Sequence, residues 1–407
     1  MGSVLKNYAS MIAMVACVAA GGLVGYLWED VALALKPVGD IFLNLLFVLV
    51  VPMVFFSVTL AFCKMHAGEG VGKTLTRTFV VFAVMWLIAS MFALLTGLIF
   101  TPIGEGFEAD GLGSLSAGQE SSGAKAFVGA LTVSDFPQLF SKFSLLPLII
   151  FSAILGMGVS SAGEKGLAFH AFLESGCEVT VKAMGVLMKA GPVGLGCYFA
   201  GTIAELGSSL LQGYLRVFVV YCCCAAVFFF VFNPLLVFYR RGSRGVKAFF
   251  KSILPPSITA LATSSSSAAM PQNIDAAKSV GISDSVAESI VPLSTNLLKP
   301  GSVMLDTFKI CFLLLLTGQS IGTPLSILLC TGGAVLAALV SGAVTNGGVT
   351  GELLICSLLG VDPAFVGIIM IIGTICDIPA TVVNAQSTVV AATLVERPAS
   401  VSQTSGT

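Results

Sequence analysis

Four polar side chains recur at helical spacing inside an apolar stretch near the end of the sequence. Asp377, Thr381, Asn384 and Thr388 are separated by 4, 3 and 4 residues, so they share one face of an α-helix. A carboxylate in the middle of a membrane costs about 3 kcal/mol to insert, and it must meet a cation, hydrogen-bond donors or water. We interpret the four residues as a binding surface. The alternative is structural, with Asp377 capping a helix broken near Pro379 and the amide and hydroxyls bonding neighbouring helices.

A second polar segment contains a pair of residues that disfavour helix. Pro300 and Gly301 follow Lys299 in the stretch Ser294–Ser302. We expect the chain to unwind at Pro300 and Gly301, which would free backbone carbonyl oxygens to bind a cation. Lys299 lies at this break and is open to two interpretations. Its ammonium group either takes the place of a metal cation inside the protein, or extends to the membrane surface or pairs with Asp306.

Four consecutive serines, Ser264–Ser267, separate two short apolar segments. Ile253–Thr263 precedes the serines and a similar segment runs on to Lys278; each is about half of the ~20 residues that cross a bilayer. Hydroxyls and free N–H groups at half-helix ends bind carboxylates, aided by the positive end of the helix dipole. The pattern predicts a re-entrant helical hairpin with an anion-binding tip, and a serine-rich linker is the alternative.

A second unit of this kind follows. Leu325–Val344 leads into the polar tip Thr345–Gly351, and Leu353–Val361 leads away. Each hairpin is followed by a longer segment with polar residues in its middle, Ser289–Gly318 after the first and Pro363–Ala392 after the second. Two such units in succession are typical of an inverted repeat, and the paired interruptions indicate a binding site near the middle of the membrane.

The composition identifies the surroundings of these segments. Of 407 residues, 56% are hydrophobic and 10% are charged, whereas soluble domains are about 25% charged. This predicts an all-α polytopic membrane protein. The net charge of -1 provides no basic surface for nucleic acid. His66 and His170 lie far apart without a cluster of cysteines or carboxylates, so we expect no metal site built on them and no cofactor.

Long uncharged stretches mark the membrane spans. Five are clear: Tyr8–Leu27, Ile41–Cys63, Thr78–Phe100, Phe143–Gly163 and Val217–Tyr239. A sixth segment, Val179–Leu206, carries charges and is expected to face protein or water on one side. The first stretch has features of a signal peptide, but its length and the spans that follow favour a retained helix.

Charges in the loops set the expected orientation. Basic and acidic loops alternate along the chain, with Arg216 as the exception on the outer side. By the positive-inside rule, the N terminus and the basic loops are cytoplasmic. Thr101–Gly123 is expected to be a flexible external linker, and Pro398–Thr407 a disordered tail.

The chain resembles the dicarboxylate/amino acid:cation symporter family, which has the glutamate-transporter fold, as a divergent member. The motifs that carry the resemblance are Gly39–Ser57, Leu145–Ser160, Ser264–Ser283, Val291–Ser302, Thr345–Gly351 and Asp377–Thr388. The resemblance implies eight transmembrane helices plus two re-entrant hairpins, a homotrimer in a bacterial inner membrane, and elevator-type alternating access. It also implies a scaffold in residues 1–251, whose third and sixth helices move with the transport domain, and a core transport domain in residues 252–397.

The resemblance also assigns residues. It places Asp377 and Thr381 at the amino group of a substrate and Asn384 at its α-carboxylate. It completes the carboxylate pocket with Ser265, Ser266, Ser267 and the backbone of Gly348 and Val349. The tip of the second hairpin would be the extracellular gate.

Two departures from the family pattern concern the substrate. Members that carry acidic substrates have an arginine three residues after the aspartate, where this chain has Ala380; the alternative arginine position is Ser264. A second carboxylate on the substrate would lose its partner, at a cost of about 1–3 kcal/mol or more. We therefore predict a neutral amino acid as substrate. The alternative is a cation-coupled symporter of glutamate, aspartate or dicarboxylates.

Further departures concern the coupling cation. Where the family has the motif Asn-Met-Asp-Gly-Thr, this chain has Leu298–Ser302. Where the family has an aspartate late in the last helix, this chain has Thr388. Two carboxylates that would hold sodium are therefore missing, so sodium need not be the coupling ion. The coupling ion is either sodium or a proton. The candidate coupling residues are Lys299, Gly301, Ser302, Asn384 and Thr388. One hypothesis is that the ammonium of Lys299 replaces a bound sodium.

Other classes of protein fit less well. An intramembrane protease would need a base for its serine, yet neither histidine lies in the second half of the sequence. A primary pump would need an ATP-binding P-loop, and the sequence has none. An amino-acid exchanger and a channel are the alternatives to a symporter. We expect a secondary active transporter and not an enzyme.

Overall fold

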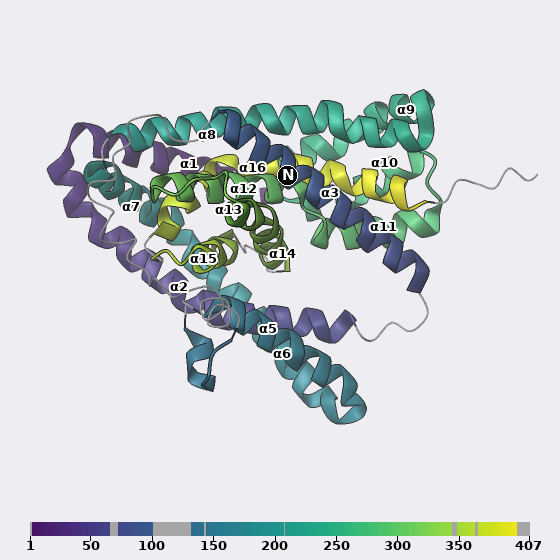
Figure 1. Ribbon diagram of the computed structural model, residues 1–407, viewed down its shortest axis with the longest axis horizontal. Helices are drawn as coiled ribbons and strands as arrows, with labels where there is room; N and C mark the ends of the chain where they lie inside the picture. Colours follow the sequence, from purple (N-terminus) through teal and green to yellow (C-terminus); the bar gives the residue numbers. More distant parts are fainter. Residues whose placement is uncertain are drawn as a thin grey trace, which may run out of the picture. The chain divides into compact units, whose positions relative to one another are not determined.

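The structure of the protein is a computed structural model, and every regular element that it describes is a helix (Figure 1). It describes residues 2–65, 72–100, 132–141, 144–206, 208–343, 348–362 and 365–396. Six helical segments among these residues are long and apolar enough to cross a membrane. The external linker at 101–123, residues 345–347 of the expected tip of the second hairpin and the tail Pro398–Thr407 lie outside the described residues.

The chain divides into two compact units, and each is described by itself. The first contains residues 1–70, 89–222 and 302–377, and the second contains residues 71–88, 223–301 and 378–407. The divisions fall inside long helices, including α3 (Gly72–Ile99), α8 (Ser208–Val227) and α16 (Phe365–Val395).

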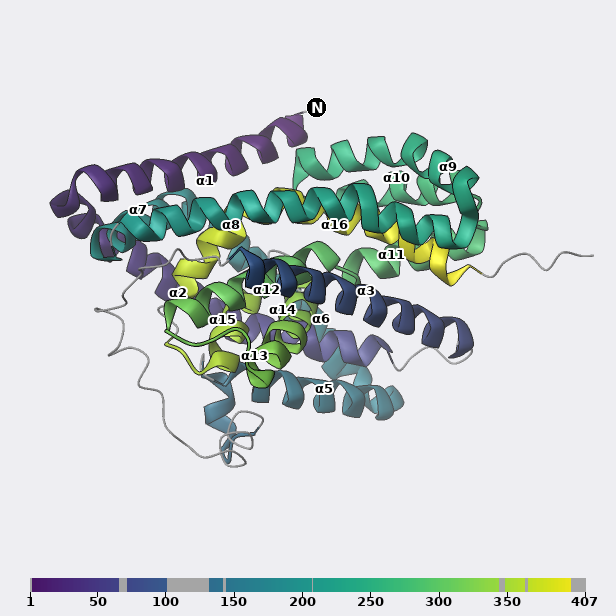
Figure 2. The same ribbon diagram turned by 45° about the horizontal axis from the view of Figure 1, so that its top comes forward.

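Close packing of long helices builds one part of the first unit. Its helices are α1 (Gly2–Leu27), α2 (Glu29–Met65), α5 (Leu145–Ser161), α6 (Leu167–Leu187) and α7 (Gly191–Leu206). Helices α1 and α2 both pack against α7, and α2 also packs against α5 and α6 (Figure 2). A Cβ atom at Gly21 would overlap the carbonyl of Gly196, and one at Gly39 would overlap the backbone of Tyr198. Glycine therefore sets the short distance between these helices.

The rest of the first unit contains the second hairpin. Its helices are α12 (Pro300–Leu316, from Ser302 onward), α13 (Pro324–Leu328), α14 (Ala334–Ala343) and α15 (Gly348–Leu359), with a π-helical turn at Leu329–Gly333. Helix α14 packs against α15. A Cβ atom at Gly351 would overlap the hydroxyl of Ser341. Two helical arms are therefore present, but the first, helical from Pro324 to Ala343, is long and apolar enough to cross a membrane and is not half a span.

The second unit contains the first hairpin. A π-helical turn at Phe228–Phe232 leads into α9 (Asn233–Thr263), and α10 (Ser266–Ser279) and α11 (Asp284–Leu297) follow. Helix α10 packs against both α9 and α11. The core of the unit is apolar and fully buried, and it includes Phe82, Phe249, Val291, Val389 and Ala391. The helical hairpin expected from the serine run is confirmed as a local structure, but its first arm is longer than the expected Ile253–Thr263, because α9 is helical from a break at Gly242 (φ 63°) to Thr263.

The expected span at Val179–Leu206 lies almost entirely within one of the six candidate spans, Gly163–Glu205. Its helix is not uniform, because α6 ends at Leu187, a short 3-10 turn follows at Met188–Ala190, and α7 begins at Gly191. Pro192 lies in the first turn of α7 and has no N–H to continue the preceding helix.

The break before α12 lies two residues earlier than expected. Leu298 and Lys299 are the non-helical residues, whereas Pro300 and Gly301 already belong to α12. Proline is well suited to the first position of a helix, where its missing N–H would have no partner. Pro379 does not break α16, which is helical from Phe365 to Val395. Prolines are tolerated inside membrane helices, where neighbouring groups satisfy the freed backbone.

Close contact at Gly39 gives a prediction about stability. The substitution Gly39→Val should lower the thermal unfolding midpoint of the purified protein, because its side chain would overlap the Tyr198 backbone. Overpacking of this kind costs about 1–3 kcal/mol. The control is Gly158→Ala in α5, where an added Cβ meets no atom within 4 Å. The control should keep or slightly raise the midpoint. Equal midpoints for both variants would show that glycine does not set the spacing of α2 and α7.

Candidate substrate and cation site

Backbone geometry at the tip of the first hairpin favours an anion site. Helix α9 ends at Thr263, and Ser264 turns the chain with φ 46° and ψ 38°, a left-handed conformation that is costly for a residue other than glycine. Ser265 is extended, and its Oγ accepts a hydrogen bond from the backbone N–H of Ala268 at 3.3 Å. Ser266 and Ser267 form the first turn of α10, where N–H groups have no acceptor within the helix.

Side-chain hydrogen bonds and ion pairs join the two arms of this hairpin, and join the end of its second arm to α11. The hydroxyl of Thr259 in α9 donates to Oε1 of Gln272 in α10 at 2.7 Å. At the base, Nζ of Lys278 lies 2.7 Å from Oε1 of Glu288 and 3.3 Å from Oδ1 of Asp284. The hydrogen bonds to Glu288 and Asp284 raise the pKa of Lys278. These groups are largely exposed, so solvent screens the pairs and they hold the hairpin base only weakly.

The break between α11 and α12 is held by an amide from α16. The backbone N–H of Leu298 still donates to the carbonyl of Ser294 at 2.8 Å. The backbone N–H of Gly301 donates to Oδ1 of Asn384 at 2.8 Å. A Cβ atom at Gly301 would overlap the carbonyl of Ala380. Asn384 therefore satisfies a backbone donor of the broken helix, and a carboxylate ligand would have to meet its donating NH2 group.

The four polar residues Asp377, Thr381, Asn384 and Thr388 all lie on helix α16, as expected, and we call them its polar face. Thr381, Asn384 and Thr388 are buried, whereas Asp377 is exposed. The hydroxyl of Thr388 donates to the carbonyl of Ala385 in its own helix at 2.8 Å, so its oxygen offers lone pairs and not a proton to a ligand. The interpretation of Asp377 as the cap of a broken helix is wrong, because α16 does not break near it.

The expected site residues fall in both units. The second unit holds Ser265, Ser266, Ser267, Lys299, Gly301, Thr381, Asn384 and Thr388, and the first holds Ser302, Gly348, Val349 and Asp377. Within the second unit, the structure brings Gly301 and Asn384 together. Gly348 and Val349, expected in the hairpin tip, form the first turn of α15. Among the described residues, no three histidine, cysteine or acidic side chains gather to hold a metal ion.

A polar network near this face was not expected from the sequence. Nδ2 of Asn233 donates to Oε1 of Gln386 at 2.7 Å and to Oγ of Ser387 at 3.3 Å. Nε2 of Gln386 donates to the carbonyl of Phe229 at 3.4 Å, inside the π-helical turn. The network ties α16 to the start of α9. A buried asparagine directly before a proline, Pro234, was the available signal.

A buried ionic cluster in the first unit was also missed. Nζ of Lys309 lies 3.1 Å from Oδ1 of Asp306 and 3.0 Å from Oε1 of Glu352. The sequence suggested Asp306 as a partner for Lys299, but the structure pairs Asp306 with Lys309. Their spacing of three residues on one helix was the signal for the pair. Glu352, an acid at the start of an apolar half-span, was the signal for the third member.

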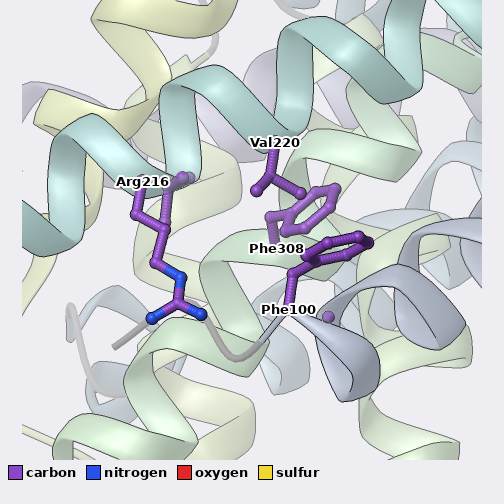
Figure 3. Close-up of a pocket in the computed structure, with 6 residues that line it drawn as sticks. Phe100, Arg216, Val220 and Phe308 are labelled. Carbon is purple, nitrogen blue, oxygen red and sulfur yellow. The ribbon is translucent and has the colours of Figure 1, made fainter. Parts of the chain in front are cut away.

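One small hollow in the first unit lies away from all of these residues. It is lined by Gly97, Phe100, Arg216, Val217, Val220 and Phe308 (Figure 3). The guanidinium of Arg216 points away from the rings of Phe100 and Phe308 (Figure 3). The hollow has about 160 Å³ of space between atoms, which includes open solvent and leaves no room for a water molecule, and none of the expected site residues lines it.

Comparison with known proteins identifies the family. The model of the sodium:dicarboxylate symporter family matches residues 11–398. A C4-dicarboxylate transport protein of Bacillus subtilis (strain 168) is 27% identical over 327 residues, which cover 78% of this chain and 77% of the relative. A proton/sodium-glutamate symport protein of Geobacillus stearothermophilus is 27% identical over 379 residues, which cover 89% of this chain and 87% of the relative.

These matches confirm the resemblance stated from the motifs. They favour the dicarboxylate and glutamate alternative over the neutral amino acid predicted from Ala380. The family consists of transporters, so the expectation that the chain is not an enzyme is also confirmed. The chain belongs to the sodium:dicarboxylate symporter family and is a multi-pass membrane protein that acts as a cation-coupled symporter.

Proposed function

We propose that the protein uses a cation gradient to accumulate an acidic amino acid or a C4-dicarboxylate. The observation that carries this proposal is the family match over residues 11–398, together with relatives named as C4-dicarboxylate and glutamate symporters. The polar face of α16 and the serine tip of the first hairpin supply groups of the required chemistry. Serine N–H and hydroxyl groups suit a carboxylate, and Asp377 suits an ammonium.

Asp377 gives a reason to prefer an amino acid within that class. An exposed carboxylate on the binding face attracts the ammonium group of an amino acid, whereas a dicarboxylate without an amino group would meet a like charge there. In this assignment Asp377 and Thr381 hold the amino group and the NH2 group of Asn384 holds the α-carboxylate. Ser265, Ser266, Ser267 and the backbone of Gly348 and Val349 complete the carboxylate pocket.

A neutral amino acid is the second candidate substrate, and Ala380 favours it. Ala380 is buried, and its carbonyl lies against Gly301 in the second unit. Neither Ala380 nor Ser264 offers a cation to a second carboxylate on the substrate. An acidic substrate must then find its counter-charge elsewhere or lose affinity.

The proposed architecture follows the family. We infer eight transmembrane helices and two re-entrant hairpins, formed by α9 with α10 and by α14 with α15, arranged as inverted repeats. Residues 1–251 form the scaffold, with the third and sixth helices moving with the transport domain, and residues 252–397 form that domain. Homotrimers would sit in a bacterial inner membrane with cytoplasmic N termini, and the tip of the second hairpin would gate an elevator movement from outside.

Transport by purified protein in liposomes tests the function. With an inward sodium or proton gradient, the protein should concentrate labelled glutamate or aspartate above equilibrium, because symport couples uptake to the gradient. Asp377→Asn should raise the apparent Km for an amino acid about 10- to 100-fold, the loss expected for one charged hydrogen bond. The control is Asp275→Asn, an exposed acid of α10 outside the polar face. Equilibration without accumulation would indicate a channel or exchanger and contradict the proposal.

The choice of substrate is tested at position 380. If neutral amino acids are the substrates, wild-type protein should concentrate alanine or serine and ignore glutamate, and Ala380→Arg should gain uptake of aspartate or glutamate through the added cation. Ser264→Arg tests the alternative position in the same assay. Concentration of glutamate at low external levels by the unmodified protein would eliminate the neutral substrate.

Lys299 is tested through the cation dependence of uptake. If its ammonium takes the place of a bound sodium, Lys299→Met should change the dependence of uptake on sodium or on pH, because an internal positive charge has been removed. Lys251→Met, at an exposed lysine of α9, is the matched control. Unchanged substrate affinity and unchanged cation dependence in Lys299→Met would refute a role in coupling.

A further inference from the structure

Three charged side chains of the first unit meet in a buried place, and we call them the Lys309 cluster. Asp306 and Lys309 belong to α12, and Glu352 belongs to α15, the second arm of the second hairpin. The exposed fraction of the side chain is 5% for Asp306, 5% for Lys309 and 2% for Glu352. The ammonium nitrogen lies 3.1 Å from the Asp306 carboxylate and 3.0 Å from the Glu352 carboxylate. One ammonium therefore joins carboxylates from two helices.

The cluster has more negative than positive charge. Two carboxylates and one ammonium give it a formal charge of -1. Oε2 of Glu352 is buried without a hydrogen-bond partner. Moving an ion from water into the protein interior raises its free energy, and only close contacts with groups of opposite charge offset that increase. Lys309 is thus the group on which both carboxylates depend.

A glycine of α16 leaves room for this arrangement within the first unit. A Cβ atom at Gly373 would lie 2.6 Å from Oε1 of Glu352 and 3.2 Å from Nζ of Lys309. Any larger residue at this position would push the carboxylate and the ammonium apart. Helix α16 therefore lies against the cluster with a glycine, which has no side chain to displace the two charged groups.

The cluster has the donor set of a site for a small monovalent cation. Carboxylate oxygens from two helices converge on one point, and the N–O distances of 3.0 and 3.1 Å are ordinary for an ammonium. If the ammonium were absent, two buried carboxylates would face the same point. Like charges at such separation do not both stay ionised unless a cation lies between them.

We propose that the Lys309 cluster is a two-carboxylate cation site that the chain fills with its own ammonium group. A small monovalent cation binds there when Lys309 is truncated. The proposal goes beyond the proposed transport function, because a tethered ammonium stays with the protein and draws nothing from the cation gradient. It also differs from the hypothesis for Lys299, which lies at the helix break and not among these carboxylates.

The test compares thermal unfolding of purified wild-type protein and Lys309→Ala in four salts of equal ionic strength. The salts are sodium, potassium, methylammonium and N-methyl-D-glucamine chloride, of which the last cation is too large for the site. The wild-type midpoint in each salt is the reference for that salt, because a cation bound at the transport site would itself raise the midpoint. Lys309→Ala should unfold at least about 5 °C lower in N-methyl-D-glucamine, and at least one small cation should restore most of that loss.

Two control variants isolate the site. Lys309→Ala/Glu352→Gln keeps one carboxylate, so it should lose the response to small cations. Glu352→Gln alone keeps the neutral pair of Asp306 and Lys309 and should unfold close to the wild-type temperature in every salt. If Lys309→Ala is recovered from membranes only when a small cation is present, that recovery is the readout and supports the proposal.

Several results would overturn it. Lys309→Ala could match the wild-type midpoint, or could respond equally to all four salts. It could be restored by lower pH and by none of the small cations, which would make the cluster a proton site. It could also fail to fold in every salt while Glu352→Gln folds. These measurements need no substrate, so a failure of the transport assay would leave their outcome readable.

Discussion

Backbone hydrogen bonding inside a bilayer is the constraint on which the rest of the structure depends. Lipid cannot satisfy an exposed N–H or C=O group, so each helix that ends or breaks there needs a protein partner. Asn384 accepts from Gly301 at the start of α12, and Ser265 caps α10 at the hairpin tip. At the far end of α16, Arg77 and Arg240 donate to the carbonyl of Leu394 at 3.2 and 3.3 Å. The same polar groups that could meet a ligand thus first make the broken helices possible.

Small residues allow such partners to reach the backbone. Gly301 can approach the carbonyl of Ala380 because neither residue has a large side chain, and this approach lets Asn384 reach the N–H of Gly301. Gly351 lies against Ser341 between the arms of the second hairpin in the same way. An arginine at position 380 would therefore change charge at a place where the helices are already in contact. In the proposed assignment, the charge of the substrate and the packing of α12 against α16 are therefore linked at this residue.

Periodic and compositional features were predictable from the sequence, and features that depend on distant partners were not. The serine run placed the turn between α9 and α10 and the end of α10, but α9 begins well before the expected Ile253. The polar spacing placed Thr381, Asn384 and Thr388 on one helix. The break at Leu298 and Lys299 lies two residues before the expected position, because a proline inside a motif can equally start a helix. The Lys309 cluster was missed because Glu352 lies 43 residues from Lys309, and no local pattern links them.

The charges inside this protein differ in what compensates them. Lys309 neutralises a carboxylate permanently, since its ammonium is held between Asp306 and Glu352. Asp377 is exposed on α16, so solvent reaches a charge at this position. The proposed site for the amino group needs a charge of this second kind, because a permanently compensated carboxylate would gain nothing from binding an ammonium. Fixed compensation suits residues that hold helices together, such as α12 and α15. The 10% of charged residues in this sequence therefore includes two groups with opposite requirements, one closed to exchange with solvent and one open to it.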